Sequence, residues 1–181
     1  DAVIGKVSET IYLAVDDIFR EPGVGGIFMA DDWGYASGTM ISPKTMRQKI
    51  VPELKKVVDL VHSTDKLFLL HSCGNMYQLM DDVIAIGVDG KHSYEDKILP
   101  VEQVYQQYAD RIAIVGGVDI NLLASGTEEQ VRKRTRQILE ACAPGGHYVL
   151  GTGNSVVNYI PISNYLAMLD EGRKWNEENW S

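Results

Sequence analysis

The chain has 181 residues, 45% hydrophobic and 23% charged, with a formal net charge of −8. These values are typical of a single globular domain with a sizeable core. The acidic balance argues against binding to nucleic acid or to an anionic membrane surface, and no apolar run approaches the roughly 20 residues that a membrane-spanning helix needs. Two cysteines are too few for a disulfide scaffold, which favours a cytoplasmic location.

Helical and extended patterns alternate through the first half of the chain. Apolar residues recur every three or four positions in residues 2–20, 43–61 and about 75–86, which predicts three helices. Short apolar runs at 26–30 and 67–70 predict strands between them. This half is therefore expected to contain one leading helix and two strand–helix units.

The second half continues the alternation. Strands and helices are predicted at residues 88–93, 100–108, 111–115, 127–142, 147–150 and from about 161 onward. Five strand–helix units in strict alternation imply a parallel sheet with right-handed crossovers. Every predicted strand ends in polar or glycine-rich sequence, so the chemistry gathers at one edge, as in a β/α barrel. Five strands do not close an eight-stranded barrel of about 250 residues.

Local signals mark several helix ends. Ser42 followed by Pro43 predicts a helix start, and Thr127 with Gln130 has the spacing of a capping box. Pro52 lies inside the second helical pattern and is expected to kink it or split it in two. The chain begins at Asp1 rather than Met, which suggests a fragment of a longer protein.

His71 and Cys73 stand where the strand at 67–70 ends. Side chains at positions i and i+2 of a strand point to the same side, so His71 and Cys73 face one site and Ser72 turns away. An imidazole and a thiolate are good zinc ligands. The alternative is a histidine that caps the strand beside a cysteine packed as a small apolar side chain.

A catalytic zinc with an open position needs a third protein ligand. Glu95 is our first choice, as ligand or as acid/base, because it also lies just past a strand end. Asp31, Asp32 and His92 are rivals. Asp31 and Asp32 are adjacent at a strand end, so at most one of these carboxylates enters the site, for substrate hydrogen bonding or proton transfer. A loop or helix-capping role is the alternative.

Four further residues are candidates for contact with a substrate. Trp33 and Tyr35 are expected to form an apolar wall or to pack against the rim. Asp119 follows two glycines that permit close approach of a ligand, or that only form a tight turn, and Asn154 follows a similar pattern. No phosphate-binding or dinucleotide-binding glycine pattern is present.

Together, four strand-end motifs give the chain a wider resemblance. They are Asp31-Asp32-Trp33-Gly34, His71-Ser72-Cys73-Gly74-Asn75, Gly116-Gly117-Val118-Asp119 and Gly151-Thr152-Gly153-Asn154. Over nearly all 181 residues the chain resembles the carboxyl-terminal half of the uroporphyrinogen decarboxylase superfamily. The resemblance implies a single domain, residues 1–181, that forms part of a (β/α)8 TIM barrel. The superfamily also contains zinc-dependent methyltransferases that serve corrinoid proteins and coenzyme M.

The resemblance implies different functions for two branches. The methyltransferases carry His-x-Cys, matched by His71 and Cys73, and a further Cys that falls at Asn154 here and is absent. The decarboxylases carry a His near that position and lack His-x-Cys. The preferred function is zinc-dependent methyl transfer of a small-molecule substrate, linked to a corrinoid protein. The alternatives are decarboxylation of a porphyrinogen and a noncatalytic binding domain or inactive fragment. Exposed sheet edges of a partial barrel predict a homo-oligomer.

Overall fold

The computed structural model describes residues 2–19 and 21–180, and its contacts divide the chain into two compact units, Asp1–Lys91 and His92–Ser181. The fold is α/β, with five strands that alternate with helices along the chain and two further strands that form a small hairpin. Of the strand pairs whose register is defined, two run parallel and the pair in the small hairpin runs antiparallel. The predicted class, part of a β/α barrel with about five strand–helix units, agrees with this order.

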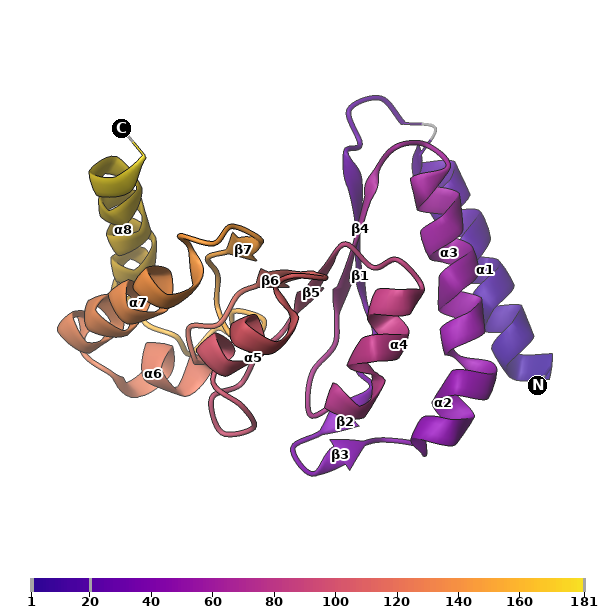
Figure 1. The fold of residues 1–181 in the computed structure, drawn as a ribbon, viewed down its shortest axis with the longest axis horizontal. Helices are drawn as coiled ribbons and strands as arrows, with labels where there is room; N and C mark the ends of the chain where they lie inside the picture. Colours follow the sequence, from indigo (N-terminus) through magenta and orange to yellow (C-terminus); the bar gives the residue numbers. More distant parts are fainter. Residues whose placement is uncertain (1, 20, 181) are drawn as a thin grey trace. The chain divides into compact units, whose positions relative to one another are not determined.

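The first unit contains a leading helix, a parallel strand pair, a small hairpin and the helices between them. Its elements are α1 (Ala2–Phe19), β1 (Gly26–Ala30), β2 (Gly34–Tyr35), β3 (Gly38–Thr39), α2 (Pro43–Lys49), α3 (Val51–His62), β4 (Leu67–His71), the 3₁₀ turn η1 (Tyr77–Leu79), α4 (Met80–Ala85) and β5 (Gly90–His92), whose last residue begins the second unit. Helices α1 and α3 pack along each other (Figure 1).

Strands β1 and β4 pair in parallel from Gly26 opposite Leu67 to Ala30 opposite His71. Phe68 and Leu70 of β4 are fully buried, and β4 packs on α3. Burial of each such side chain stabilises the fold by about 1.5–3 kcal/mol. The register matters for function because it sets the residues that follow β1 beside those that follow β4.

The second unit also contains a parallel strand pair with helices between and after its strands. Its elements are α5 (Val101–Tyr108), β6 (Ala113–Val115), α6 (Ile120–Ser125), α7 (Glu128–Cys142), β7 (Tyr148–Val149) and α8 (Ile162–Asn179). β6 and β7 pair in parallel, and α7 and α8 pack side by side (Figure 1). Ile114, Leu123, Ile138 and Met168 form part of its buried core.

The predicted helix signals are confirmed. Ser42 accepts a hydrogen bond from the Thr45 amide, and Thr127 and Gln130 form a complete capping box. The pattern that contains Pro52 is split into α2 and α3, as expected. The residue-20 end of the first predicted helix lies outside the described residues.

Three short features were missed. The β2–β3 hairpin has two residues in each strand, and α6 has six residues, so neither shows a periodic pattern. The helix predicted from about residue 75 begins instead as the turn η1 at Tyr77. None of the described helices is both long enough and apolar enough to cross a membrane.

Candidate functional site

Asp32, His71 and Cys73 form a cluster at the carboxyl ends of β1 and β4 in the first unit. One ligand atom from each side chain lies within 4.8 Å of the other two. The Cys73 Sγ lies 3.3 Å from His71 Nε2, and that nitrogen lies 3.8 Å from Asp32 Oδ1. The prediction that His71 and Cys73 face one site is confirmed by this geometry, and Asp32 is the third member of the cluster.

Backbone contacts between the two strand ends position the cluster. The Cys73 amide donates to Asp32 Oδ1 at 3.1 Å, and the Asp31 amide donates to the His71 carbonyl at 3.0 Å. Ser72 turns away, as predicted, and its Oγ accepts a hydrogen bond from the Trp33 amide at 3.0 Å. The loop that follows β1 and the loop that follows β4 are therefore joined by hydrogen bonds on both sides of the cluster.

A glycine permits the close contact between these loops. Gly74 has a φ of +75°, and a Cβ at this position would lie 2.2 Å from the Gly34 carbonyl oxygen. The next residue, Asn75, donates its amide to the Tyr35 carbonyl at 2.7 Å. Only a residue without a side chain fits here, so Gly74 fixes the path of the loop that carries Cys73.

The surroundings of His71 and Asp32 favour the protonation states in which these two groups ligate a metal. Burial lowers the pKa of His71, with the charge of Asp32 acting against this effect and that of Lys91 adding to it. Hydrogen bonds from the thiol and the amide of Cys73 lower the pKa of Asp32. At neutral pH the imidazole is therefore neutral and the carboxylate ionised, the forms in which both groups ligate a metal.

The donor set fits zinc. Nitrogen, sulfur and oxygen ligands at zinc bond lengths of about 2.0–2.3 Å stand roughly 3.4–3.6 Å apart in a tetrahedron. The observed separations of 3.3 Å and 3.8 Å bracket that range. Three protein ligands leave the fourth position open, as in catalytic zinc sites. Asp32 is solvent-exposed and His71 is buried, so one side of the cluster is open to solvent.

The other predicted residues of the first unit have separate positions. Asp31 and Asp32 point in different directions, as expected, because Asp31 Oδ2 accepts a hydrogen bond from Trp33 Nε1 at 2.8 Å. Trp33 is buried, and with Asp31 it lines an apolar cavity of about 180 Å³ against α1 and α3. Tyr35 is 62% exposed on the hairpin. Substrate contact by these three residues stays a prediction.

The second unit gathers the remaining predicted residues in one pocket. Glu95, Asp119 and Asn154 line a cavity of about 270 Å³, together with Lys97 and Asn121. The metal-ligating cluster found among the described residues contains Asp32 and not Glu95. Glu95 as a metal ligand therefore stays a prediction, while its place in this polar pocket suits an acid/base or substrate-binding role.

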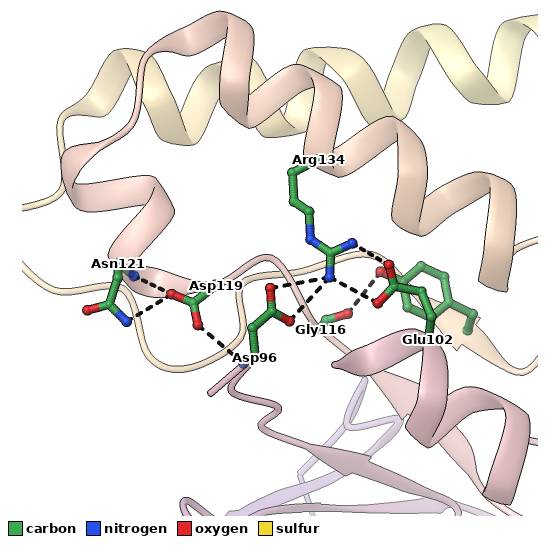
Figure 2. Close-up of polar contacts among 7 residues, drawn as sticks. Asp96, Glu102, Gly116, Asp119, Asn121 and Arg134 are labelled. Atoms are coloured by element: carbon green, nitrogen blue, oxygen red, sulfur yellow. Dashed lines mark hydrogen bonds and ion pairs between the residues drawn. The ribbon is translucent and has the colours of Figure 1, made fainter. Parts of the chain in front are cut away.

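Asp119 has a structural task in that pocket. Its Oδ1 accepts hydrogen bonds from the Asn121 amide and side chain at 2.7 and 2.9 Å and so caps α6, and its Oδ2 accepts from the Asp96 amide at 3.3 Å (Figure 2). Asp96 in turn pairs with Arg134. Sequence reasoning missed Arg134 because a charged residue on an amphipathic helix is usually solvated, and it missed Asp96 because this residue lies in a turn with no periodic pattern.

Comparison with known proteins gives a consistent result. A family model for uroporphyrinogen decarboxylase (URO-D) matches residues 1–175. A methylated-thiol–coenzyme M methyltransferase from Methanosarcina mazei is 29% identical over 142 residues, which are 78% of this chain and 35% of that protein. The methylcobamide:CoM methyltransferase MtaA from Methanosarcina barkeri is 27% identical over 164 residues, which are 90% of this chain and 45% of that protein.

A solved structure shows the same fold. A methyltransferase from Methanosarcina mazei superimposes with a TM-score of 0.77 at 23% identity, over 93% of this chain and 47% of that one. The chain thus spans less than half the length of each of these relatives. The likeness covers both units described above.

Proposed function

This chain belongs to the uroporphyrinogen decarboxylase (URO-D) family, and from that membership and its Asp32–His71–Cys73 cluster we propose that it is the zinc-holding part of a corrinoid-linked methyltransferase. The observation that carries the proposal is the meeting of nitrogen, sulfur and oxygen donors within 4.8 Å at one strand edge. The names of the methyltransferase relatives support the reaction type.

His71, Cys73 and Asp32 would hold the metal. Zinc would supply a Lewis acid that keeps a substrate thiol in its nucleophilic thiolate form. In the proposed transfer, the bond between the methyl carbon and the corrinoid cobalt would break as a carbon–sulfur bond forms. The bonding electron pair would stay on the cobalt, and the thiol proton would be released. Because one side of the cluster is open, a small thiol has access to it.

The residues around the cluster have supporting roles in this proposal. Burial of His71 and the tie between Asp32 and the Cys73 amide orient the donors before the metal arrives. In the second unit, Glu95 and Asn154 line a pocket of their own, where Glu95 would act as an acid/base or bind a polar group of a ligand. The methyl donor would be the corrinoid of a partner protein.

A methyl-transfer assay tests the proposal. The zinc-supplemented chain is mixed with methylcobalamin and 2-mercaptoethanol, and loss of the methyl–cobalt absorbance is followed together with the appearance of the thioether. We expect thioether formation that falls at least about 100-fold in Cys73→Ala, since ligand loss removes the metal chemistry. Cys142→Ala is the matched control, because this buried cysteine lies in the core of the second unit.

Three results would count against methyl transfer. Equal thioether formation by wild type and Cys73→Ala would show that the cluster does not act in it. Decarboxylation of uroporphyrinogen III without added metal would support instead the carboxy-lyase alternative. A folded, zinc-loaded chain with neither activity would favour the noncatalytic alternative.

A further inference from the structure

Arg134 on α7 pairs with two carboxylates of the second unit, which lie 38 and 32 positions before it in the sequence. Its guanidinium donates from Nη2 to both Asp96 carboxylate oxygens at 3.2 and 3.3 Å, and it pairs through Nη1 and Nη2 with Glu102 on α5 (Figure 2). The Arg134 side chain is 19% exposed. A planar guanidinium with both partners in place makes stronger and more directional hydrogen bonds than an exposed pair.

The ionisation of Asp96 depends on this arginine. Burial raises the pKa of Asp96, while the charge and hydrogen bonds of Arg134 act against this rise. Burial raises the pKa of Glu102, but hydrogen bonds from Arg134, a backbone hydrogen bond and the charge of Arg134 together outweigh it, so this pKa is lowered. Arg134 is thus the counter-ion that makes an ionised Asp96 tolerable at this place in the fold.

Asp96 belongs to the turn that carries Glu95 into the polar pocket. The Tyr94 amide donates to the Gly153 carbonyl at 2.8 Å, and the Asp96 amide donates to Asp119 Oδ2 at 3.3 Å. Glu95 lies between these two fastened residues and lines the pocket. The Asp96 side chain adds a third attachment, on the far side of the turn, through Arg134 (Figure 2).

We propose that Arg134 is a positioning residue for the polar pocket: through Asp96 it fixes the turn that presents Glu95 beside Asp119 and Asn154. The competing explanation is that Arg134 only ties α7 to α5 through Glu102. The proposal concerns the pocket itself, so it holds or fails independently of zinc binding and methyl transfer.

The two roles are separated by substituting one partner at a time. Asp96→Asn removes the attachment of the turn and leaves the pair between Arg134 and Glu102. Glu102→Gln breaks the ionic tie to α5 and leaves the pair between Arg134 and Asp96. Arg136→Met is the matched control, because Arg136 stands on the same helix and also pairs with two carboxylates, Glu171 and Glu178.

Two NMR measurements on the full chain report on the stability of the turn and on the position of Glu95. Hydrogen exchange at the Asp96 amide reports the turn's attachment to Asp119, and the carboxyl carbon-13 shift of Glu95 reports where that side chain lies. We expect Asp96→Asn to speed exchange at this amide about tenfold and to shift the Glu95 resonance, while amides inside α5 and α7 keep their protection. Arg134→Met, which removes both pairs, is expected to do the same to the turn.

Glu102→Gln and Arg136→Met are expected to leave the Asp96 amide within about twofold of wild type and the Glu95 resonance in place. Arg134→Lys keeps the charge but loses the fork, and is expected to give an intermediate exchange rate. The proposal is overturned if Glu102→Gln loosens the turn as much as Asp96→Asn does, or if Asp96→Asn leaves the Glu95 resonance unmoved.

Discussion

Single residues determine the shape of the candidate metal centre, and Gly74 is the clearest case. It combines a left-handed backbone with a contact to Gly34 that leaves no space for a side chain. The loop that follows His71 can reach the end of β1 only because this position is a glycine. Cys73 is therefore held beside Asp32 by a neighbouring glycine, which has no functional side chain of its own.

Gly74→Ala is predicted to destabilise the first unit. The positive φ costs roughly 1–2 kcal/mol for an L-residue, and the 2.2 Å approach to the Gly34 carbonyl adds a clash with backbone that cannot move cheaply. Gly23→Ala is the matched control, since Gly23 also has a positive φ (+85°) but an added Cβ there would meet no atom within 4 Å. Denaturant unfolding should show the larger loss for Gly74→Ala, and equal losses would contradict the argument.

A second residue-scale prediction concerns pH and Glu102. Burial raises its folded-state pKa, but hydrogen bonds from Arg134, a backbone hydrogen bond and the charge of Arg134 together lower it below the ordinary 4.5. The stability that its charge contributes is therefore fully present above pH 4.5 and is lost as pH falls through the lower folded-state pKa. Arg134 stays charged throughout, and Asp96, whose pKa is raised, is protonated first.

The measurement is the free energy of unfolding of wild type minus that of Glu102→Gln, as a function of pH. The difference should be constant above pH 4.5 and should shrink in acid. A difference that grows as the pH falls would have the wrong sign for a carboxylate with a lowered pKa.

Some residues of the site could be predicted from the sequence and others could not. His71 and Cys73 were predictable because the two-residue period of a strand is local. Asp32 stood only among the rivals for the third ligand, because its contact with Cys73 spans 41 positions and follows from the β1–β4 register. Nothing local in the sequence distinguishes Asp32 from Asp31.

At the scale of elements, helix ends with a side-chain cap were predicted well. The capping box of α7 is a reciprocal pair of hydrogen bonds between Thr127 and Gln130, four residues in one stretch. By contrast α6 depends on the Asp119 cap and on packing within the second unit. Short elements of this kind have too few residues to show a period, which is why they were missed.

Thr127→Ala is predicted to lower the free energy of unfolding by about 1 kcal/mol, because the Gln130 amide loses its acceptor at the first turn of α7. Thr127→Ser keeps the hydroxyl and should retain most of that stability. Thermal or denaturant unfolding of the three proteins checks this. A loss as large in the serine variant would place the effect in the methyl group and not in the cap.

At the scale of the whole chain, large apolar side chains remain exposed on strands β1, β4 and β7 and on helix α1. Phe28 and Leu67 are more than half exposed in the first unit, as is Val149 in the second, and α1 exposes Val3 and Val7. The chain also spans less than half of the relatives compared above. Apolar surface of this extent is typical of a surface that another chain or segment covers.

The chain is accordingly predicted to self-associate. Sedimentation velocity should show a species heavier than the monomer that dissociates on dilution. Val7→Glu, which places a charge on the exposed face of α1, should weaken the association if that helix takes part. Lys6→Glu is the control, because Lys6 is also exposed on α1 but pairs with Glu9 and contributes no apolar surface. A monomer at every concentration would contradict the prediction.

The most direct test of the central claim is the metal content of the chain and the ligands of that metal. Metal analysis and zinc X-ray absorption should find one zinc per chain with one sulfur at about 2.3 Å and nitrogen and oxygen ligands at about 2.0–2.2 Å. Zinc should be lost in His71→Ala and Cys73→Ala, weakened in Asp32→Asn, and retained in Glu95→Gln and Cys142→Ala. A folded chain that binds no zinc, or that binds it equally well without Cys73, would contradict the account.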